Sequence, residues 1–392
     1  CVRRIQPRAW SNLYMSTDDI TLHRGLAGVY FDRTETTFID GKVGKLLYRG
    51  YNIHDLAGVS TFEETSYLLM YGELPTAAQL EDFDSDLKKN REIPSEVMGI
   101  IRAVKDDHPM SVLRTAVSAL SAFDPESEEN SSEATLRKGI RLTSQVPTIV
   151  MAHHNIRNGK EPVAPSTTLS HAANFLYMMD GEEPNPETAA LMDTDFVLHA
   201  DHGSNASAFT ARAVAGTNAD LHDAVTAGIG ALSGPSHGGA AENVMTMALE
   251  IGEAENAEQY VKDLLAGGGR VMGFGHRVYK AEDPRARHLR EGVRKLSAEK
   301  GEPKWYGILE AVQQAMSPYG RRGIHVNVDF FAGVIYYLNG IPHDLFVPIF
   351  AVGRIPGWTV QVIEQFEHNI LIRPLLQYSG PDERPYIPMS DR

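Results

Sequence analysis

The chain has 392 residues, with 37 Lys and Arg against 51 Asp and Glu, for a formal net charge of -14. A chain of this length forms about two or three domains and buries a core without help from disulfides or metals. The acidic balance argues against a nucleic-acid-binding protein, which needs a basic surface. The single cysteine, Cys1, excludes an internal disulfide and a cysteine-based metal site, and a reducing, cytoplasmic location fits this composition best.

The N-terminal residues differ from the rest of the chain. Residues 1–17 contain three arginines and no acidic residue, which is typical of a transit peptide and equally of an upstream extension from a misassigned start. We therefore expect a disordered N-terminal extension over 1–20. No membrane span is expected, because the most apolar stretch, Phe330 to Leu338, is well short of the roughly 20 apolar residues that a bilayer requires.

The first regular element is a β hairpin, and helices follow it. Two strand-like stretches, 36–39 and 46–48, flank Asp40 and Gly41, a pair that is typical of hairpin turns. Later stretches have apolar residues at helical spacing. They are 62–71, 112–120, 134–155, 168–180, 187–198, 206–216 and 219–232. The sequence therefore predicts a mainly α fold with a small N-terminal β hairpin.

Four polar clusters interrupt the helical pattern and are the candidate sites. They are VLHADHGSNAS at 197–207, GALSGPSHGG at 230–239, GGGRVMGFGHRVYKAEDPR at 267–285 and HVNVDF at 325–330. Glycines beside His237 and His276 would let a ligand approach the backbone closely, although such glycines more often mark a turn. The helix expected after His237 would lower the pKa of its imidazole and keep it neutral. Asp329, just before an apolar helix, also fits the ordinary role of a helix N-cap.

The common catalytic motifs are missing or incomplete. The stretch 273–278 lacks the third glycine of a dinucleotide-binding loop, and the chain has no P-loop sequence and no Gly-x-Ser-x-Gly motif. His199, Asp201 and His202 could bind a metal, but this spacing without a further ligand is nonspecific. A metal-dependent hydrolase built on these three residues remains an alternative from another enzyme class, and sensitivity to a chelator would identify it.

The combination of clusters resembles the citrate synthase family. The motifs SGPSHGGA at 233–240, GFGHRVYKAEDPR at 273–285 and NVD at 327–329 carry the resemblance, and GRIPGW at 353–358 extends it. The resemblance covers residues 21–378 and is closest to the short prokaryotic and archaeal type. It implies an almost all-α, two-domain subunit in a homodimer.

The resemblance also implies the domain boundaries. A large helical domain would comprise 21–237 and 335–392. A small helical domain, 238–334, would be inserted into it and would close over the active site. Closure would fit the glycines that flank both histidine motifs.

The catalytic residues of the family fall on His237, His276 and Asp329. The resemblance implies that Asp329 removes a proton from the methyl group of acetyl-CoA, while His237 hydrogen-bonds the thioester oxygen as an enol or enolate forms. His276 would polarise the ketone of oxaloacetate, and hydrolysis of the citryl thioester would follow. No metal and no tightly bound cofactor are implied, because the coenzyme A thioester is a co-substrate.

The residues that bind the substrates are implied in the same way. Oxaloacetate would be bound by Arg285, Arg354 and Arg373 with His202 alongside, since planar guanidinium groups suit bidentate contacts with carboxylates. In the family, the residue that matches Arg373 reaches the site of the partner subunit, so the homodimer would be functional.

Coenzyme A would lie along a single segment of the third cluster. The segment comprises Arg270, Val271, Met272, Gly273 and Phe274. Lys280, Arg287 and Arg290 are candidates for its phosphates on charge alone. One position departs from the family: Gln361 stands where a histidine usually follows the Gly-Trp pair, so this position hydrogen-bonds but does not titrate.

The sequence thus predicts a citrate synthase, which condenses acetyl-CoA with oxaloacetate and water. The alternative in the same class is 2-methylcitrate synthase, which uses propionyl-CoA through the same residues. One methylene in an apolar pocket is worth only about 1–3 kcal/mol, so overlap between the two substrates is expected. A helical scaffold protein without catalysis is disfavoured, because His237, His276 and Asp329 are all present.

Overall fold

The computed structural model describes residues 21–392, and the predicted extension over 1–20 lies outside the described residues. Contacts between residues divide the chain into two units, Cys1–Thr34 and Glu35–Arg392. In the first unit, the described residues form a short 3-10 turn, η2 (Arg24–Leu26). All the α-helices and strands of the described residues belong to the second unit.

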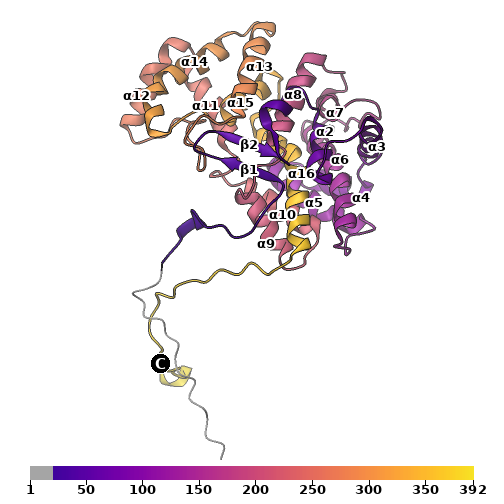
Figure 1. Ribbon diagram of the computed structural model, residues 1–392, viewed down its shortest axis with the longest axis vertical. Helices are drawn as coiled ribbons and strands as arrows, with labels where there is room; N and C mark the ends of the chain where they lie inside the picture. Colours follow the sequence, from indigo (N-terminus) through magenta and orange to yellow (C-terminus); the bar gives the residue numbers. More distant parts are fainter. Residues whose placement is uncertain (1–20) are drawn as a thin grey trace, which may run out of the picture. The chain divides into compact units, whose positions relative to one another are not determined.

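The second unit is built mainly from α-helices (Figure 1). These are α1 (Ile53–Leu56), α2 (Phe62–Tyr71), α3 (Ala77–Lys89), α4 (Ser95–Ala103), α5 (Pro109–Leu120), α6 (Ser132–Arg157), α7 (His171–Asp180), α8 (Pro186–His199), α9 (Ala206–Ala215), α10 (Leu221–Leu232), α11 (Ala240–Ile251), α12 (Ala257–Ala266), α13 (Ala286–Glu299), α14 (Lys304–Met316), α15 (Asp329–Leu338) and α16 (Phe346–Glu367). The 3-10 turns are η3 (Ser121–Phe123), η4 (Ala254–Asn256), η5 (Ser317–Arg322), η6 (His343–Leu345) and η7 (Met389–Asp391). The predicted mainly α fold is confirmed.

The predicted hairpin is also confirmed, as part of a three-stranded antiparallel sheet. Its strands are β1 (Thr37–Asp40), β2 (Lys45–Tyr48) and β3 (Tyr51–Asn52), in the order β1-β2-β3. Thr37 pairs with Tyr48 and Asp40 with Lys45, so the turn comprises residues 41–44. The sheet lies against the helical body: Tyr48 Oη of β2 donates to the Leu198 carbonyl oxygen of α8 at 3.3 Å, and Thr36 Oγ1, just before β1, donates to Glu364 Oε1 of α16 at 2.7 Å.

Local sequence explains where the helices begin and end. The side chain of Thr61 accepts a hydrogen bond from the Glu64 N–H at the start of α2. Gly72 ends the same helix with a φ of 89°, a conformation that glycine adopts without strain. Ser131 caps α6 as Thr61 caps α2.

Helix α16 runs through the core and sets the position of the candidate site (Figure 1). It packs against α2, α6, α8, α9 and α10. Two of its glycines permit this close packing: a Cβ on Gly357 would clash with the carbonyl oxygen of Ala200, and one on Gly353 would lie 3.2 Å from the His199 Cβ. The helix therefore lies directly against the end of α8, and it carries Arg354 there.

The segment around α16 is more apolar than the sequence analysis recognised. Residues His343–Glu367 are long and apolar enough to cross a membrane, with a mean hydropathy of 1.3 in the most apolar window. Within the protein, 94% of that window is buried. Its composition is therefore explained by its place in the core, and it is weak evidence for a membrane span.

Helices α11 to α15 lie together on one side of the unit (Figure 1). Helices α11 and α13 both pack on α15, and α12 packs on α14. This group spans the predicted small domain, 238–334. The division into a large and a small domain stays a prediction, because the contacts group Glu35–Arg392 as one unit.

After α16, the chain leaves the helical body as an extended C-terminal tail, residues 369–392 (Figure 1). Many of its side chains are apolar and exposed. They are Ile370, Leu371, Leu375, Leu376, Tyr378, Tyr386, Ile387 and Met389. Arg373 lies in this tail and is exposed as well.

Two interacting acidic residues, Glu63 on α2 and Asp193 on α8, lie in the helical body. The His171 N–H donates to Glu63 Oε1 at 2.7 Å, and the Phe62 N–H lies 3.2 Å from both carboxylate oxygens of Asp193. Burial, followed by the charge of Glu63, raises the pKa of Asp193 from 3.8 to about 7. Burial also raises the pKa of Glu63.

We expect this pair to make the protein less stable as the pH rises from about 4 to about 7. In that window, the unfolded chain releases the Asp193 proton while the folded protein retains it, so the free energy of unfolding falls by a few kcal/mol. Asp193→Asn should flatten this dependence, whereas Asn at the exposed Asp82 should not. Urea unfolding at several pH values measures the free energy of unfolding. If it depended on pH in the same way in the Asp193→Asn and Asp82→Asn variants, the prediction would be wrong.

Candidate active site

His237 lies in the turn between α10 and α11, and its contacts define its tautomer. Its Nε2 accepts a hydrogen bond from the Ser207 N–H at 3.3 Å and lies 3.0 Å from Ser207 Oγ. Trp358 Nε1 donates to the same hydroxyl at 3.2 Å. Because Nε2 is an acceptor, the ring proton is on Nδ1, where it can be donated to a ligand.

The imidazole of His237 is neutral, as the sequence analysis expected, but for a different reason. Burial first, and then the charge of Arg354, lower its pKa to about 4. The expected cause, a helix N-terminus, does not dominate, since α11 begins three residues later at Ala240. A neutral imidazole offers a hydrogen bond without a full charge.

His276 has the opposite tautomer. Its Nδ1 accepts hydrogen bonds from the N–H groups of Val278 at 3.0 Å and Tyr279 at 3.1 Å, so the ring proton is on Nε2. Burial, followed by the charge of Arg285, lowers its pKa to about 4. His276 is therefore a second neutral donor.

His202 lies beside His276, with 5.3 Å between the ring centroids. It is buried, and its Nε2 lies 3.0 Å from Tyr279 Oη. Burial and the charge of Arg285 hold its pKa well below the usual value. The structure therefore brings two of the predicted histidines together.

The loop of His276 is paired with the segment that leads into α15. The Gly275 N–H donates to the His325 carbonyl oxygen at 2.8 Å, and the Asn327 N–H donates to the Gly273 carbonyl oxygen at 2.9 Å. This pairing brings residues 50 and 54 positions apart in the sequence side by side. It explains how the third and fourth clusters meet in one site.

Asp329 is the first residue of α15 and is not its N-cap. The N-cap is Val328, and no side chain caps this helix. No hydrogen bond to the Asp329 carboxylate is found among the described residues. Burial raises its pKa, while His199 and Arg285 act to lower it. A carboxylate without a structural partner and with increased basicity is suited to act as a general base.

Arg285 is buried and held by a bidentate ion pair. Its Nε and Nη2 donate to Asp283 Oδ1 at 3.0 Å and Oδ2 at 2.8 Å. The Val328 N–H donates to the same carboxylate at 3.3 Å, which ties the pair to the start of α15. The charge of Arg285 acts to lower the pKa of His202, of His276 and of Asp329.

Arg354 is the most informative residue of the site. Its Nε donates to the His199 carbonyl oxygen at 2.5 Å, and its guanidinium lies over the Phe350 ring at 4.7 Å. Its Nη1 and Nη2 atoms are buried and have no hydrogen-bond partner in the part of the chain that the structure describes. Burial lowers its pKa to about 10. A buried guanidinium with two unused donor groups is expected to bind a carboxylate.

Arg373 is the one predicted carboxylate-binding residue that this chain does not bring into its own site. It lies on the exposed C-terminal tail, whereas Arg285 and Arg354 are buried. Its predicted role depends on a second copy of the chain.

The predicted coenzyme A segment, 270–274, packs against α15. The ring of Phe274 packs against that of Phe330, with centroids 4.9 Å apart. Gly273 is buried with a φ of 75°, and a Cβ there would lie 2.7 Å from the Phe330 ring. Arg270 is exposed, as are the predicted phosphate contacts Lys280 and Arg287. Arg290 instead pairs with Glu282.

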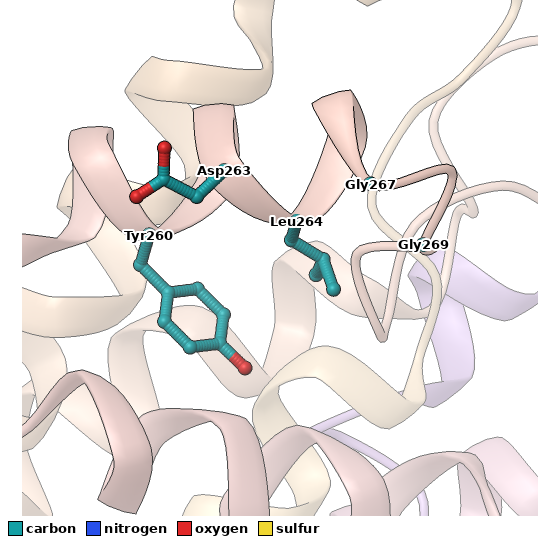
Figure 2. A pocket seen from close by; sticks show the side chains of 5 residues that line it. All are labelled: Tyr260, Asp263, Leu264, Gly267 and Gly269. Carbon is teal, nitrogen blue, oxygen red and sulfur yellow. The ribbon is translucent and has the colours of Figure 1, made fainter.

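An open depression of about 380 Å³ lies next to this segment, at the end of α12. It is lined by Tyr260, Asp263, Leu264, Gly267 and Gly269. Figure 2 shows the side chains of Tyr260 and Leu264 on one side of α12, while Asp263 points to the other.

The proposed metal site is not supported. Among residues 21–392, no group of three or more His, Cys, Asp or Glu side chains is placed to hold a metal ion. Asp201 has a structural role, since it accepts hydrogen bonds from Thr37 Oγ1 at 2.5 Å and from the Gly203 N–H at 2.9 Å. Gln361 lies near it, with Oε1 accepting from Arg212 Nη1 at 3.2 Å.

Several residues that shape the site were missed in the sequence. Ser207 and Tyr279 belong to the polar clusters already recognised, but their partners lie 30 and 77 residues away. Phe350 precedes Arg354 by one helical turn, so helical spacing alone would have placed both on one face. Asp283 was recognised only as part of a motif.

The chain is similar to known proteins over nearly its whole length. The family model "Citrate synthase, C-terminal domain" matches residues 25–375. The chain is 46% identical to the citrate synthase of Deinococcus radiodurans over 371 residues, which is 94% of this chain and 98% of that protein. It is also 40% identical to 2-methylcitrate synthase 1 of Corynebacterium glutamicum over 380 residues, covering 95% and 99% of the two chains.

Solved structures show the same similarity. The crystal structure of citrate synthase from Pyrobaculum aerophilum has a TM-score of 0.90 and 40% identity, with 100% of both chains covered. A complex of the Thermoplasma acidophilum citrate synthase with carboxymethyl coenzyme A and oxaloacetate has a TM-score of 0.90 and 32% identity, covering 95% of this chain and 100% of that one.

Proposed function

The chain belongs to the citrate synthase family of acyltransferases, and we propose that it condenses acetyl-CoA with oxaloacetate and water to give citrate and CoA. The observation that carries this proposal is Arg354, whose buried Nη1 and Nη2 have no hydrogen-bond partner among residues 21–392. The charge of Arg354 acts on His237, which is a neutral hydrogen-bond donor, and His276 is a second neutral donor of the site. Such a site suits a substrate with a carboxylate and a carbonyl oxygen on which charge develops.

The two tautomers give the two histidines different roles. Asp329, whose pKa is raised by burial, takes a proton from the methyl group of the thioester. The Nδ1–H of His237 stabilises the thioester oxygen as negative charge develops on it. The Nε2–H of His276 polarises the ketone, which is then attacked by the new carbon nucleophile. Hydrolysis of the citryl thioester completes the reaction.

Oxaloacetate is assigned to the basic residues around these groups. Arg354 offers two unused donors to one carboxylate. Arg285 adds a second buried guanidinium, fixed in place by Asp283, and His202 lies alongside. The acidic chain thus concentrates positive charge where a dianionic substrate needs it.

Coenzyme A is assigned to the segment 270–274 as a co-substrate, with no tightly bound cofactor. The Thermoplasma acidophilum relative, named for its complex with carboxymethyl coenzyme A and oxaloacetate, supports this assignment. Lys280 and Arg287, both exposed, are candidates for the phosphates.

We also propose a homodimer in which Arg373 completes the site of the partner subunit. The tail that carries Arg373 is rich in exposed apolar side chains, which favours burial against a second copy. A cytoplasmic location stays a prediction, for which the single cysteine is the support.

Release of the CoA thiol in the presence of oxaloacetate is the experiment that tests the proposed function. We expect kcat/KM to be higher for acetyl-CoA than for propionyl-CoA, by roughly 10- to 200-fold if the acyl pocket excludes one methylene. EDTA should have no effect, because the proposed chemistry uses only side chains. A preference for propionyl-CoA would make the chain a 2-methylcitrate synthase, and the absence of thiol release with either substrate would reject the proposal.

A further inference from the structure

The strands of the N-terminal β hairpin are fixed to the segment that carries His202. Thr37 Oγ1 donates to Asp201 Oδ2 at 2.5 Å, and Tyr48 Oη donates to the Asp201 carbonyl oxygen at 2.8 Å. Just ahead of β1, two backbone N–H groups donate to Glu364 Oε1 on α16, at 2.9 and 3.1 Å. The base of the hairpin is therefore a fixed part of the helical body.

The tip of the hairpin, residues 41–44, lies on the loop that follows His276. The carbonyl oxygen of Gly41 accepts a hydrogen bond from the Lys280 N–H at 2.7 Å. The two backbones are so close that a Cβ on Gly41 would clash with the carbonyl oxygen of Val278. Only glycine permits this contact.

The same tip makes a second contact further along the loop. Gly44 has a φ of 67°, and a Cβ there would lie 2.6 Å from the carbonyl oxygen of Glu282, three residues before Arg285. Just after Arg285, His288 Nε2 on α13 lies 2.8 Å from His54 Nδ1 on α1. The N-terminal elements thus contact the loop at residues 278–280 and at Glu282, and contact α13 just after it.

The part of the loop that Gly41 contacts orients two histidines. The N–H groups of Val278 and Tyr279 donate to His276 Nδ1, and Tyr279 Oη lies 3.0 Å from His202 Nε2. A shift of the 278–280 turn would therefore move His276 and disturb His202 together.

We propose that the hairpin tip, residues 41–44, is a positioning element of the active site, which holds the 276–285 loop so that His276 and Arg285 meet oxaloacetate correctly. The proposal rests on the proposed function, because it assigns oxaloacetate to these two residues. The tip acts through the backbone of the loop, and its effect is on the geometry of catalysis.

Glycine substitutions with a matched control test this proposal. Gly41→Ala and Gly44→Ala should lower kcat/KM for oxaloacetate by at least about 10-fold, since a displacement on the order of 1 Å at a catalytic group has effects of this size or larger. Gly50→Ala is the control: Gly50 has a φ of 89° in the turn between β2 and β3, but a Cβ there would meet no atom of the described residues within 4 Å. It should share the backbone strain of Gly44→Ala and keep kcat/KM within about 2-fold.

A spectroscopic measurement separates positioning from a general loss of structure. In the folded variants, the ¹³C chemical shift of the C2 carbonyl of bound oxaloacetate should move toward its value in free oxaloacetate, because His276 polarises the ketone less. An unchanged shift, or equal kinetics for Gly44→Ala and Gly50→Ala, would overturn the proposal. If Gly41→Ala does not fold, Gly44→Ala and its control decide alone. Failure of the unaltered protein to release CoA would instead reject the proposed function.

Discussion

Asp329→Asn is expected to lower kcat by about 100- to 10,000-fold, the range for loss of a general base, while oxaloacetate affinity stays within about 2-fold. The substitution keeps the size of the side chain and removes its capacity to take a proton. It breaks no hydrogen bond among the described residues and no helix cap, because Val328 is the N-cap of α15. In the unaltered enzyme, kcat should fall as the pH falls through the raised pKa of Asp329.

Asp223→Asn provides the matched control for this prediction. Asp223 also lies in the first turn of a helix, α10, so its substitution removes the same favourable interaction with a helix N-terminus. We expect nearly unchanged kcat for this variant. Thiol release gives kcat and calorimetry gives oxaloacetate affinity. Full activity of Asp329→Asn would remove Asp329 from the role of base.

The fold could be predicted from local patterns because helices and hairpins depend on neighbouring residues. The pair Asp40 and Gly41 marked the hairpin turn, and the helical spacing over 62–71 predicted α2. The length of the apolar segment around α16 was missed. It contains Gly353 and Gly357, which look like breaks in the sequence but allow close helix packing.

The catalytic positions came from a family resemblance, and their physical state depends on contacts that the sequence does not show. The expected neutrality of His237 agrees with its pKa of about 4, but burial is the main cause. The tautomers of His237 and His276 depend on hydrogen bonds from Ser207 and from Val278 with Tyr279. The first of these joins residues 30 positions apart, which no local pattern predicts.

Arg354→Met is expected to weaken oxaloacetate binding by about 2–5 kcal/mol, or roughly 30- to 5,000-fold in Kd, because it removes one partner of a buried charge pair. The same change should stabilise the free enzyme by about 1–3 kcal/mol, because replacing two buried donor groups that have no partner among the described residues outweighs the loss of the Nε hydrogen bond to the His199 carbonyl oxygen. Calorimetric titration and urea unfolding without substrate measure these opposite effects.

Arg212→Met is the matched control for the effect on stability. Arg212 is also buried, but its guanidinium is used by Glu364, Gln361 and Gln365. Its loss removes three hydrogen bonds and the ion pair with Glu364, and should destabilise the free enzyme by about 1–3 kcal/mol. If both variants changed the free energy of unfolding in the same direction, the stability data would give no support to Arg354 as a binding residue that costs the free enzyme stability. Opposite effects on the free energy of unfolding would show that Arg354 is kept for a carboxylate that residues 21–392 do not supply.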